Sequence, residues 1–412
     1  MSDQSVAEPA TATASASPLT GKAPSGRVPA LWLALLAAPM AMGANAPVLI
    51  LPSMARSLAV PTATATWLVT VFAWAMTIGS PLCAGMIRQR GLRPALLVSG
   101  TAVAVGTTLV TTAPWLPLAL TGRAVQAIGG AGLVAVAMNL TGSTRRMGVI
   151  TAGFGILGAS GPLLGSVLAS AVSWRLSLAL SAVALLAIPA VWRHTQRTPP
   201  AVTTFDATGA GLVVALASAL VLIPTAPLAA ALAALVIAVP LVVHAKRNPD
   251  GFVPAVLLRS PAFIGSALLA CAFSTSYFAL LFSLPRLIAQ RTPWSTDAIG
   301  TGQLIALLLG SALSWILSAS AGRLAYRTVL TALITLGALA PLTAAFATWG
   351  PLLLLAATAA VLVSTGSNAV LSIRAAKDAP DHQRPTAIGL FVLCYQLGGA
   401  LGPALAALLV LK

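Results

Sequence analysis

The chain has 412 residues, of which 58% are hydrophobic and only 7% are charged, and its mean hydropathy is +0.95. So little charge cannot cover the surface of a water-soluble domain, which excludes the soluble fold classes. The formal net charge is +16, but the basic residues occur in small groups between apolar stretches, a pattern typical of membrane-protein loops and not of a nucleic-acid-binding face.

Long apolar stretches follow one another along nearly the whole chain. Residues 1–27, rich in Ala, Ser, Thr and Pro, come first and predict a disordered cytoplasmic tail rather than a signal peptide. Each later stretch is long enough to cross a hydrocarbon core of about 30 Å as a helix. Six precede a basic stretch at 193–197, two follow it and five complete the chain, at 28–52, 66–87, 95–113, 117–140, 147–170, 175–192, 207–224, 228–245, 261–285, 301–322, 328–346, 351–370 and 385–411. The sequence therefore predicts an all-α polytopic membrane protein with about 13 transmembrane helices.

The distribution of Lys and Arg predicts the orientation in the membrane. With the tail inside, 17 of the 23 basic residues face the cytoplasm, five face outside and Arg123 lies within a segment. Cytoplasmic loops carry the excess of basic residues in membrane proteins. We therefore predict a multi-pass protein of the plasma (inner) membrane with a cytoplasmic N-terminus and with Lys412 outside.

Two local patterns recur and indicate an internal repeat. The pair Gly161-Pro162 in the fifth segment has a counterpart, Gly402-Pro403, in the last one. The second and tenth segments both end in small residues followed by spaced arginines, at 82–93 and 317–327. We therefore predict an N-terminal six-helix bundle at 28–192, an inserted central helix pair with its loops at 193–260, and a C-terminal five-helix bundle at 261–412 that lacks the mate of the sixth helix.

These segments resemble the major facilitator superfamily, in particular its fourteen-helix drug:proton antiporter branch. The resemblance rests on Trp67-Leu-Val-Thr-Val-Phe-Ala-Trp-Ala75, on Phe205-Asp-Ala-Thr-Gly209, on Arg259-Ser-Pro-Ala-Phe263 and on the central helix pair. The stretch Arg123-Ala-Val-Gln-Ala-Ile-Gly129 is similar to the family's Arg-x-x-Gln-Gly-x-Gly motif, with Ala127 in place of one glycine. The resemblance implies the major facilitator fold, in which two bundles rock about a central cavity, and the export of drug-like molecules.

Arg123 is the most costly residue of this motif, because a charge within a membrane helix needs a polar cavity or a partner. We expect it to face the cavity together with Gln126, one helical turn further on. The alternative is that its side chain snorkels to the outer interface near Trp115.

The fifth segment resembles the family's antiporter motif. Gly148, Gly161, Pro162 and Gly165 match this motif, although Leu157 stands where a glycine is usual. Small residues at this spacing let two helices touch and bend, which would seal the cavity on one side during alternating access. Ordinary helix packing by small residues is the alternative explanation.

The stretch from Gly85 to Arg93 takes the place of the family's cytoplasmic gating motif. Gly91 and Arg93 match it in register, but Arg88 stands at the position of the motif's acidic residue. The alternative is that these arginines only anchor the loop on the positive-inside side of the membrane.

Carboxylates, which commonly exchange protons against substrate in this family, are scarce in the chain. Of its seven acidic residues, none lies deep within an apolar segment. Gly43 stands where the family commonly has an acid in the first segment, and Asp206, at the cytoplasmic edge of the seventh, is the nearest carboxylate. The sequence therefore leaves the coupling ion open, with protons as one candidate.

We predict a secondary-active exporter of amphipathic small molecules and not an enzyme. Neutral or acidic substrates are expected, because no deep carboxylate offsets Arg123. Candidate cavity or coupling residues are the large polar side chains of the central segments together with Asp206: Asn45, Arg123, Gln126, Asn139, Asp206, Tyr277, Gln303 and Tyr395. The sequence has no phosphate-binding loop, metal-ligand spacing or catalytic constellation, so we predict no cofactor, no metal, no catalytic residue and no nucleic-acid partner. Two alternatives stay open, a transport-inactive family member that acts as a membrane scaffold and a transporter of a metabolite anion.

Overall fold

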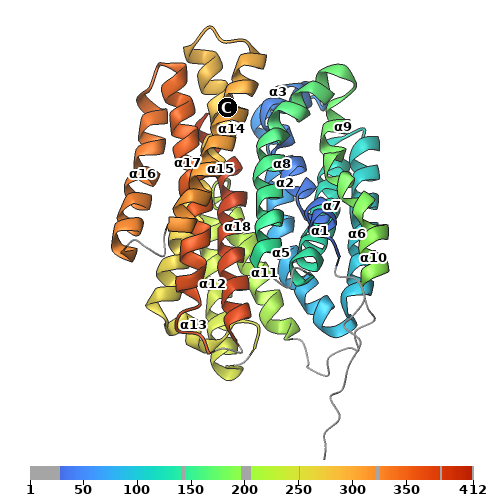
Figure 1. Cartoon of the computed structure of the whole chain (residues 1–412), viewed down its shortest axis with the longest axis vertical. Helices are drawn as coiled ribbons and strands as arrows, with labels where there is room; N and C mark the ends of the chain where they lie inside the picture. The colour runs from blue at the N-terminus through green and yellow to red at the C-terminus, as the bar shows by residue number, and fades with distance from the viewer. Residues whose placement is uncertain are drawn as a thin grey trace, which may run out of the picture.

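The computed structural model describes residues 28–140, 144–195, 206–249, 251–320, 325–380 and 383–410. The predicted tail at 1–27 and Lys412 lie outside these ranges. Within them every regular element is a helix (Figure 1), and 12 helices are long and apolar enough to cross a membrane. The predicted all-α polytopic fold is thereby confirmed.

The segment predicted at 207–224 accounts for the difference between 13 predicted membrane helices and these 12. It forms α11 (Ala207–Val221), which has 15 residues and is about 22 Å long at about 1.5 Å per residue. This length is less than the hydrocarbon thickness of about 30 Å. Turns at 222–226 then lead into α12 (Pro227–Arg247).

Prolines divide the first predicted segment into short helices. These are α1 (Ala30–Ala37), α2 (Pro39–Asn45), the 3₁₀ helix η1 (Ala46–Leu49) and α3 (Leu51–Ser57). Pro39, Pro47 and Pro52 stand at the first or second position of α2, η1 and α3, where a missing backbone N–H is tolerated.

The other predicted segments form helices close to their expected bounds. Up to the inserted pair these are α4 (Thr62–Ala65), α5 (Trp67–Arg90), α6 (Leu92–Thr112), α7 (Leu116–Asn139), α8 (Thr144–Ala171), α9 (Trp174–Leu178), η2 (Ala179–Ala187) and α10 (Ile188–His194). After α12 they are α13 (Ala255–Arg259), α14 (Pro261–Arg291), α15 (Thr296–Ser320), α16 (Tyr326–Phe346), α17 (Gly350–Ala375) and α18 (Arg384–Leu409).

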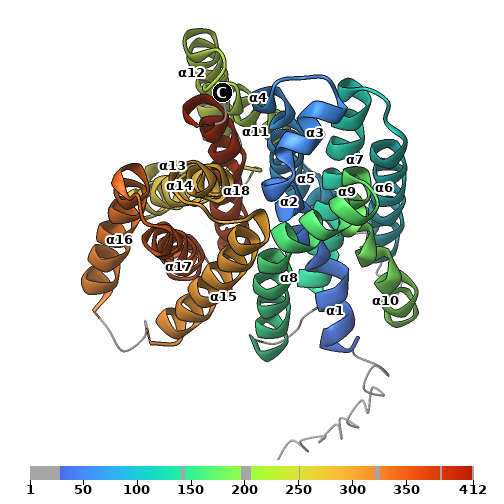
Figure 2. The ribbon, with the colours of Figure 1, turned by 90° about the horizontal axis from the view of Figure 1, so that it is seen from above.

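Seen from above, the helices gather into two groups (Figure 2). We call α1–α10 the first group and α14–α18 the second group. The buried apolar core of the first group includes Leu33, Leu96 and Leu133. That of the second group continues from Phe391 to Val213 on α11 and Leu241 on α12. The inserted pair thus packs on the second group, and α11 also packs against α5 of the first group.

Two helix contacts between the groups are the most extensive. Counted by membrane-crossing helices, α5 and α15 are the second helices of the first and second group, and α8 and α18 are the fifth. The second helix of each group packs against the fifth helix of the other, so that α5 contacts α18 and α15 contacts α8. The same contact is thus made twice with the groups exchanged, as a two-fold relation between repeats requires. The chain enters α1 at one face of the molecule and leaves α18 at the opposite face (Figure 1). We call the face where α5 begins and α18 ends the outer face, which the predicted orientation makes extracellular.

Candidate functional site

Arg123 on α7 lies inside the first group and is fully buried. Its guanidinium donates to the backbone carbonyl oxygens of Leu68 on α5, at 3.3 Å, and of Gly43 on α2, at 3.2 Å. It also lies over the ring of Phe72, 4.0 Å from the ring centre. Within the described ranges no carboxylate forms an ion pair with it. Carbonyl dipoles and an aromatic face therefore hold the charge, and the side chain does not snorkel to the membrane surface.

Gln126 extends this arrangement to two more helices. Its amide oxygen accepts a hydrogen bond from Arg123 Nη1 at 2.7 Å. Its Nε2 donates to Thr107 Oγ1 on α6, at 2.9 Å, and to the carbonyl oxygen of Leu178 on α9, at 3.1 Å. The pair thus joins α7 to four neighbouring helices, all of them in the first group.

Glycines let α6 and α7 approach closely around this pair. A Cβ added at Gly129 would lie 2.6 Å from the carbonyl oxygen of Ser99, and one at Gly122 would lie 2.8 Å from the nitrogen of Val110. Gly129 is the last residue of the Arg123 motif. The motif therefore contributes both the buried charge and the close helix contact that encloses it.

In the same way, α8 touches α2 at the predicted antiporter motif. The buried Asn45 donates through Nδ2 to the carbonyl oxygen of Gly158 at 2.9 Å. A Cβ added at Gly161 would lie 2.6 Å from the carbonyl oxygen of Met42, and one at Gly165 would overlap the backbone of Ala46. Pro162 lies within α8 beside this contact, and Gly148 lies near the start of the same helix.

The second group makes the equivalent contact between α18 and α14. A Cβ added at Gly402 would lie 2.5 Å from Phe278 Cβ, and one at Gly398 would overlap the carbonyl oxygen of Cys271. Pro403 lies within α18. The Gly-Pro pair therefore stands where the fifth helix meets the first in each group.

Uncharged polar side chains occur inside the second group. The hydroxyls of Tyr395 on α18 and Ser364 on α17 are 2.9 Å apart. Tyr277 on α14 packs against an apolar cluster of the second group. Gln303 on α15 donates to the carbonyl oxygen of Leu281 at 3.0 Å, while its own buried Oε1 has no hydrogen-bond partner among the described residues. The structure thus brings three of the predicted residues into one group, separate from Arg123 and Gln126.

An apolar cluster closes the space between the two groups toward the outer face. We call it the outer seal, and it consists of Val48, Leu51, Val69, Ala159, Leu281, Phe282, Leu307, Val361 and Ala406. Deeper in the molecule, Ser80 on α5 donates to Gln396 Oε1 on α18 at 3.2 Å. The groups are therefore in direct contact along α5 and α18.

The other predicted residues lie toward the face opposite the seal. Asn139, at the end of α7, is exposed and donates only to the carbonyl oxygen of Ala135 on its own helix, at 2.8 Å. Asn139 is the last residue of α7, whereas Arg123 and Gln126 lie nearer the other end of this helix. The structure therefore does not bring Asn139 near the other candidate cavity residues.

The predicted gating stretch joins α5 to α6. Gly91, at the junction, has φ 85° and ψ 177°, a left-handed conformation that favours glycine. Arg93 donates from Nε to the carbonyl oxygen of Thr195 at 2.7 Å and lies 5.1 Å from the Trp192 ring centre. Gly85 and Arg88 lie within α5, and the side chain of Arg88 lies outside the described part. Arg93 therefore links two helices of the first group and does not reach the second.

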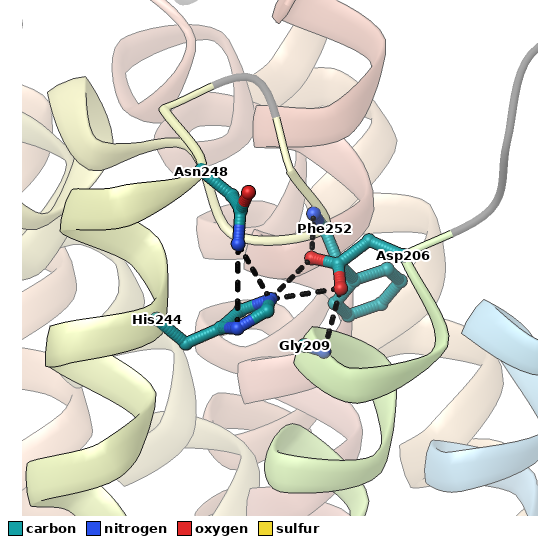
Figure 3. A network of polar contacts seen from close by, with 5 residues as sticks. All are labelled: Asp206, Gly209, His244, Asn248 and Phe252. Carbon is teal, nitrogen blue, oxygen red and sulfur yellow. Dashed lines mark hydrogen bonds and ion pairs between the residues drawn. The ribbon is translucent and has the colours of Figure 1, made fainter.

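Asp206 caps the start of α11 (Figure 3). Its carboxylate accepts hydrogen bonds from the backbone amides of Gly209, at 2.8 Å, and Phe252, at 2.9 Å, and it pairs with His244 Nε2 on α12 at 2.8 Å. Partial burial raises the pKa of Asp206, but the hydrogen bonds outweigh burial and hold this pKa below its ordinary value. The group thus fixes the inserted helix pair and lies away from the other candidate cavity residues.

Several of these contacts could not be read from the sequence. His244 had no local sign of a role, since its partner lies 38 positions away. Thr107 and Gln396 likewise bond to residues on distant helices. The Asp-x-x-Gly pattern at 206–209 was a usable signal, because Asp is a preferred helix N-cap.

Comparisons with known proteins agree with this architecture. A family model described as Major Facilitator Superfamily matches residues 31–403. A chloramphenicol resistance protein of Streptomyces lividans is 30% identical over 173 residues, which cover 39% of this chain and 42% of that protein. An MFS transporter L2 of Phoma sp. is 29% identical over 152 residues, which cover 35% of this chain and 25% of that protein. The matched part thus spans less than half of either relative.

Solved structures share the fold over most of the chain. The crystal structure of the human organic anion transporter MFSD10 (TETRAN) matches with a TM-score of 0.62 and 19% identity, covering 92% of each chain. A POT family transporter in complex with 5-aminolevulinic acid matches with a TM-score of 0.62 and 15% identity, covering 92% of this chain and 89% of that one. At such identities the likeness concerns the fold alone.

Proposed function

Because the chain belongs to the Major Facilitator Superfamily, we propose that it is a secondary-active transporter that exports amphipathic small molecules by alternating access. The motifs at Trp67–Ala75, 205–209 and 259–263 favour the drug:proton antiporter branch. The positive-inside pattern favours the plasma membrane with a cytoplasmic N-terminus.

The observation that carries this proposal is the repeated contact between the two groups. Between the groups, α5 meets α18 and α15 meets α8. Within each group, a glycine lets the fifth helix lie directly on the first, Gly161 where α8 meets α2 and Gly402 where α18 meets α14. Such contacts allow two bundles to rock as rigid bodies while their internal packing is kept. The apolar contact of the two groups in the outer seal supports a closed outer side in this arrangement.

The proposed substrate is a neutral or acidic amphipathic molecule. Tyr277, Gln303 and Tyr395 supply uncharged hydrogen-bonding groups in the second group, and we assign them to substrate contact. Asn45, Arg123 and Gln126 are assigned to the first-group side of the pathway, and Asn139 is left out of it because of its position. The name of the Streptomyces relative, a chloramphenicol resistance protein, is consistent with a neutral antibiotic as cargo.

Protons are the proposed coupling ion, although no membrane-embedded carboxylate among the described residues offers the usual exchange site. Asp206 has structural partners on three sides, so we propose that it anchors the inserted pair rather than exchanging protons. In the proposed gate at 85–93, Arg93 attaches the start of α6 to the end of α10.

The test is transport by the purified chain in proteoliposomes. Vesicles loaded with chloramphenicol are followed with and without an imposed pH gradient, beside protein-free vesicles. We expect protein-dependent movement that the gradient accelerates. Movement that ignores the gradient would remove proton coupling but keep transport. A folded protein that moves neither chloramphenicol nor an acidic amphipath would overturn the proposal in favour of a membrane scaffold.

A further inference from the structure

A cavity of about 190 Å³ lies at the outer face, beside the outer seal and outside the pathway described above. Three parts of the chain line it. Thr66, Trp67 and Thr70 come from the start of α5, Ala404 and Ala407 from the end of α18, and Thr225 from the turn between α11 and α12. It is therefore formed where the first group, the second group and the inserted pair meet.

The walls are apolar apart from hydroxyl groups, and none of the lining residues carries a charge. Thr70 is only 1% exposed and brings a hydroxyl group to the lining of the cavity. Thr225 is exposed and marks the mouth of the cavity. A hydroxyl group on an otherwise apolar wall is suited to one uncharged hydrogen-bonding group of a ligand.

The volume limits what can enter. Sites that enclose a drug-sized molecule have volumes of about 300–1,000 Å³. A cavity of about 190 Å³ holds only one end of such a molecule, with the remainder passing the mouth at Thr225. An aromatic ring or short chain that carries a hydroxyl or carbonyl group meets both the size and the chemistry.

The cavity is directly linked to the outer seal. Val69 and Ala406 belong to the seal, and the next residues along the same helices, Thr70 and Ala407, line the cavity. Separation of α5 from α18 at the outer face would open the seal and pull the cavity walls apart. A molecule that contacts both walls therefore favours the closed seal over the open one.

We infer that this cavity is a binding site for the uncharged end of a small amphipathic molecule, and that its occupancy holds the outer face closed. The binding part of this inference is independent of the proposed function. The effect of occupancy on transport rests on the proposed function. A soluble amphipathic molecule and a membrane lipid can both supply the required uncharged hydrogen-bonding group, because a lipid ester carbonyl also accepts a hydrogen bond.

Binding is tested on the full chain in lipid nanodiscs with 4-bromobenzyl alcohol as the probe. Bromine quenches tryptophan fluorescence on contact, so a probe in the cavity quenches Trp67. We expect saturable quenching that Trp67→Phe removes and that Thr70→Val weakens about three- to tenfold, the effect of one ordinary hydrogen bond. Thr111→Val is the matched control, because the Thr111 hydroxyl bonds to its own helix on α6, and it should bind as the parent does. The charged analogues 4-bromobenzoate and 4-bromobenzylamine should quench at least tenfold more weakly.

Quenching that never saturates, or that is equal in Thr70→Val and Thr111→Val, would overturn the site. Nanodiscs of ether-linked lipids, which lack ester carbonyls, identify its natural occupant. Tighter probe binding in ether lipids supports the site with a lipid as occupant, and equal binding supports it with a soluble molecule. In proteoliposomes the probe should slow efflux by the parent at concentrations about three- to tenfold lower than those needed for Thr70→Val. Saturable binding without this slowing would overturn the closing effect while leaving the transporter proposal intact, because efflux itself is measured in the same vesicles.

Discussion

At the scale of single residues, Arg123 is a buried cation to which the described part of the first group supplies no carboxylate. The sequence indicated that this charge needs a polar environment inside the membrane, and the structure supplies one from carbonyl groups and Gln126. These partners could not be predicted, because carbonyl groups occur at every residue and only the packing of α2 and α5 on α7 selects Gly43 and Leu68.

Substitutions at Arg123 should separate stability from transport. Arg123→Met keeps much of the side-chain volume but leaves the buried acceptors without a donor, which costs about 1–3 kcal/mol each, so we expect a lower melting temperature and no transport. Arg123→Ala should also insert and lose transport, and its melting temperature should fall further, because a void remains beside the same acceptors. Arg123→Lys should restore only part of the transport, since an ammonium cannot reproduce the guanidinium fork. Full transport by Arg123→Met would show that the charge has only a packing role.

Asp206 should contribute stability over a defined pH range. Its pKa in the folded protein lies below its ordinary value, which is about 3.9 in an unfolded chain. The ionised carboxylate therefore stabilises the protein above about pH 4, and this contribution is lost as the pH falls through the folded-state pKa. We expect Asp206→Ala to lower stability by about 0.5–2 kcal/mol at pH 7, the usual effect of removing an N-cap. The difference in melting temperature between parent and variant should shrink as the pH falls below about pH 4.

Asp206→Asn is the matched comparison. The amide oxygen can still accept from the amide of Gly209, so part of the cap should survive while the carboxylate is lost as a partner of His244. If Asp206→Asn lowers the melting temperature as much as Asp206→Ala, the whole stabilising effect comes from the charge of the carboxylate.

At the scale of elements, the apolar stretches predicted every membrane helix, because length and hydropathy alone decide whether a segment can cross the bilayer. Two details escaped this argument. The first segment is divided at Pro39, Pro47 and Pro52, and the seventh ends at Val221 and falls short of a full span. Both depend on how neighbouring helices satisfy the backbone, which hydropathy does not report.

Two glycines of α18 should respond oppositely to alanine. At Gly402 an added Cβ would lie 2.5 Å from Phe278 Cβ, whereas at Gly389 nothing lies within 4 Å. Gly402→Ala should therefore cost about 1–3 kcal/mol through overpacking and should reduce transport. Gly389→Ala should be neutral or stabilising by up to about 1 kcal/mol, because alanine favours the helix. Thermal unfolding of both purified variants checks this, and equal behaviour would contradict the close contact of α18 with α14.

At the scale of the whole molecule, the repeated Gly-Pro pair pointed to an internal repeat. The structure shows the contact that each copy makes, the fifth helix of a group on its first helix. What the pair could not reveal is the crosswise packing of α5 on α18 and of α8 on α15, since this depends on the orientation of one group relative to the other.

The arrangement of the chain ends makes the topology testable. The chain enters α1 and leaves α18 at opposite faces (Figure 1), so a reporter fused after Lys412 should lie outside if the tail is inside. A phosphatase that is active only outside the cytoplasm should be active in this fusion, and a fluorescent protein that folds only in the cytoplasm should stay dark. The reverse pattern would invert the predicted orientation.

The last prediction concerns which molecules pass, and it follows from the charges along the membrane-spanning part. Of the described acidic residues, Asp206 caps α11, Asp378 accepts a hydrogen bond from Ser260 near the end of α17, and Asp297 is exposed in the first turn of α15. None of these three carboxylates faces the uncharged polar residues of the second group. The positive charge of Arg123 lies in the first group.

A cation between the groups would therefore meet repulsion without a compensating carboxylate. Two unit charges about 6 Å apart repel by about 3 kcal/mol at an effective dielectric constant of about 20, which is more than a hundredfold in affinity. We expect cells that lack their own pumps and express this chain to export chloramphenicol or an acidic antibiotic well and an ethidium-like cation poorly. Asp206→Asn should leave both rates near those of the parent, because its carboxylate is engaged by the inserted pair. Rapid export of the cation by both parent and Asp206→Asn would defeat the argument, since cation recognition would then need no carboxylate at all.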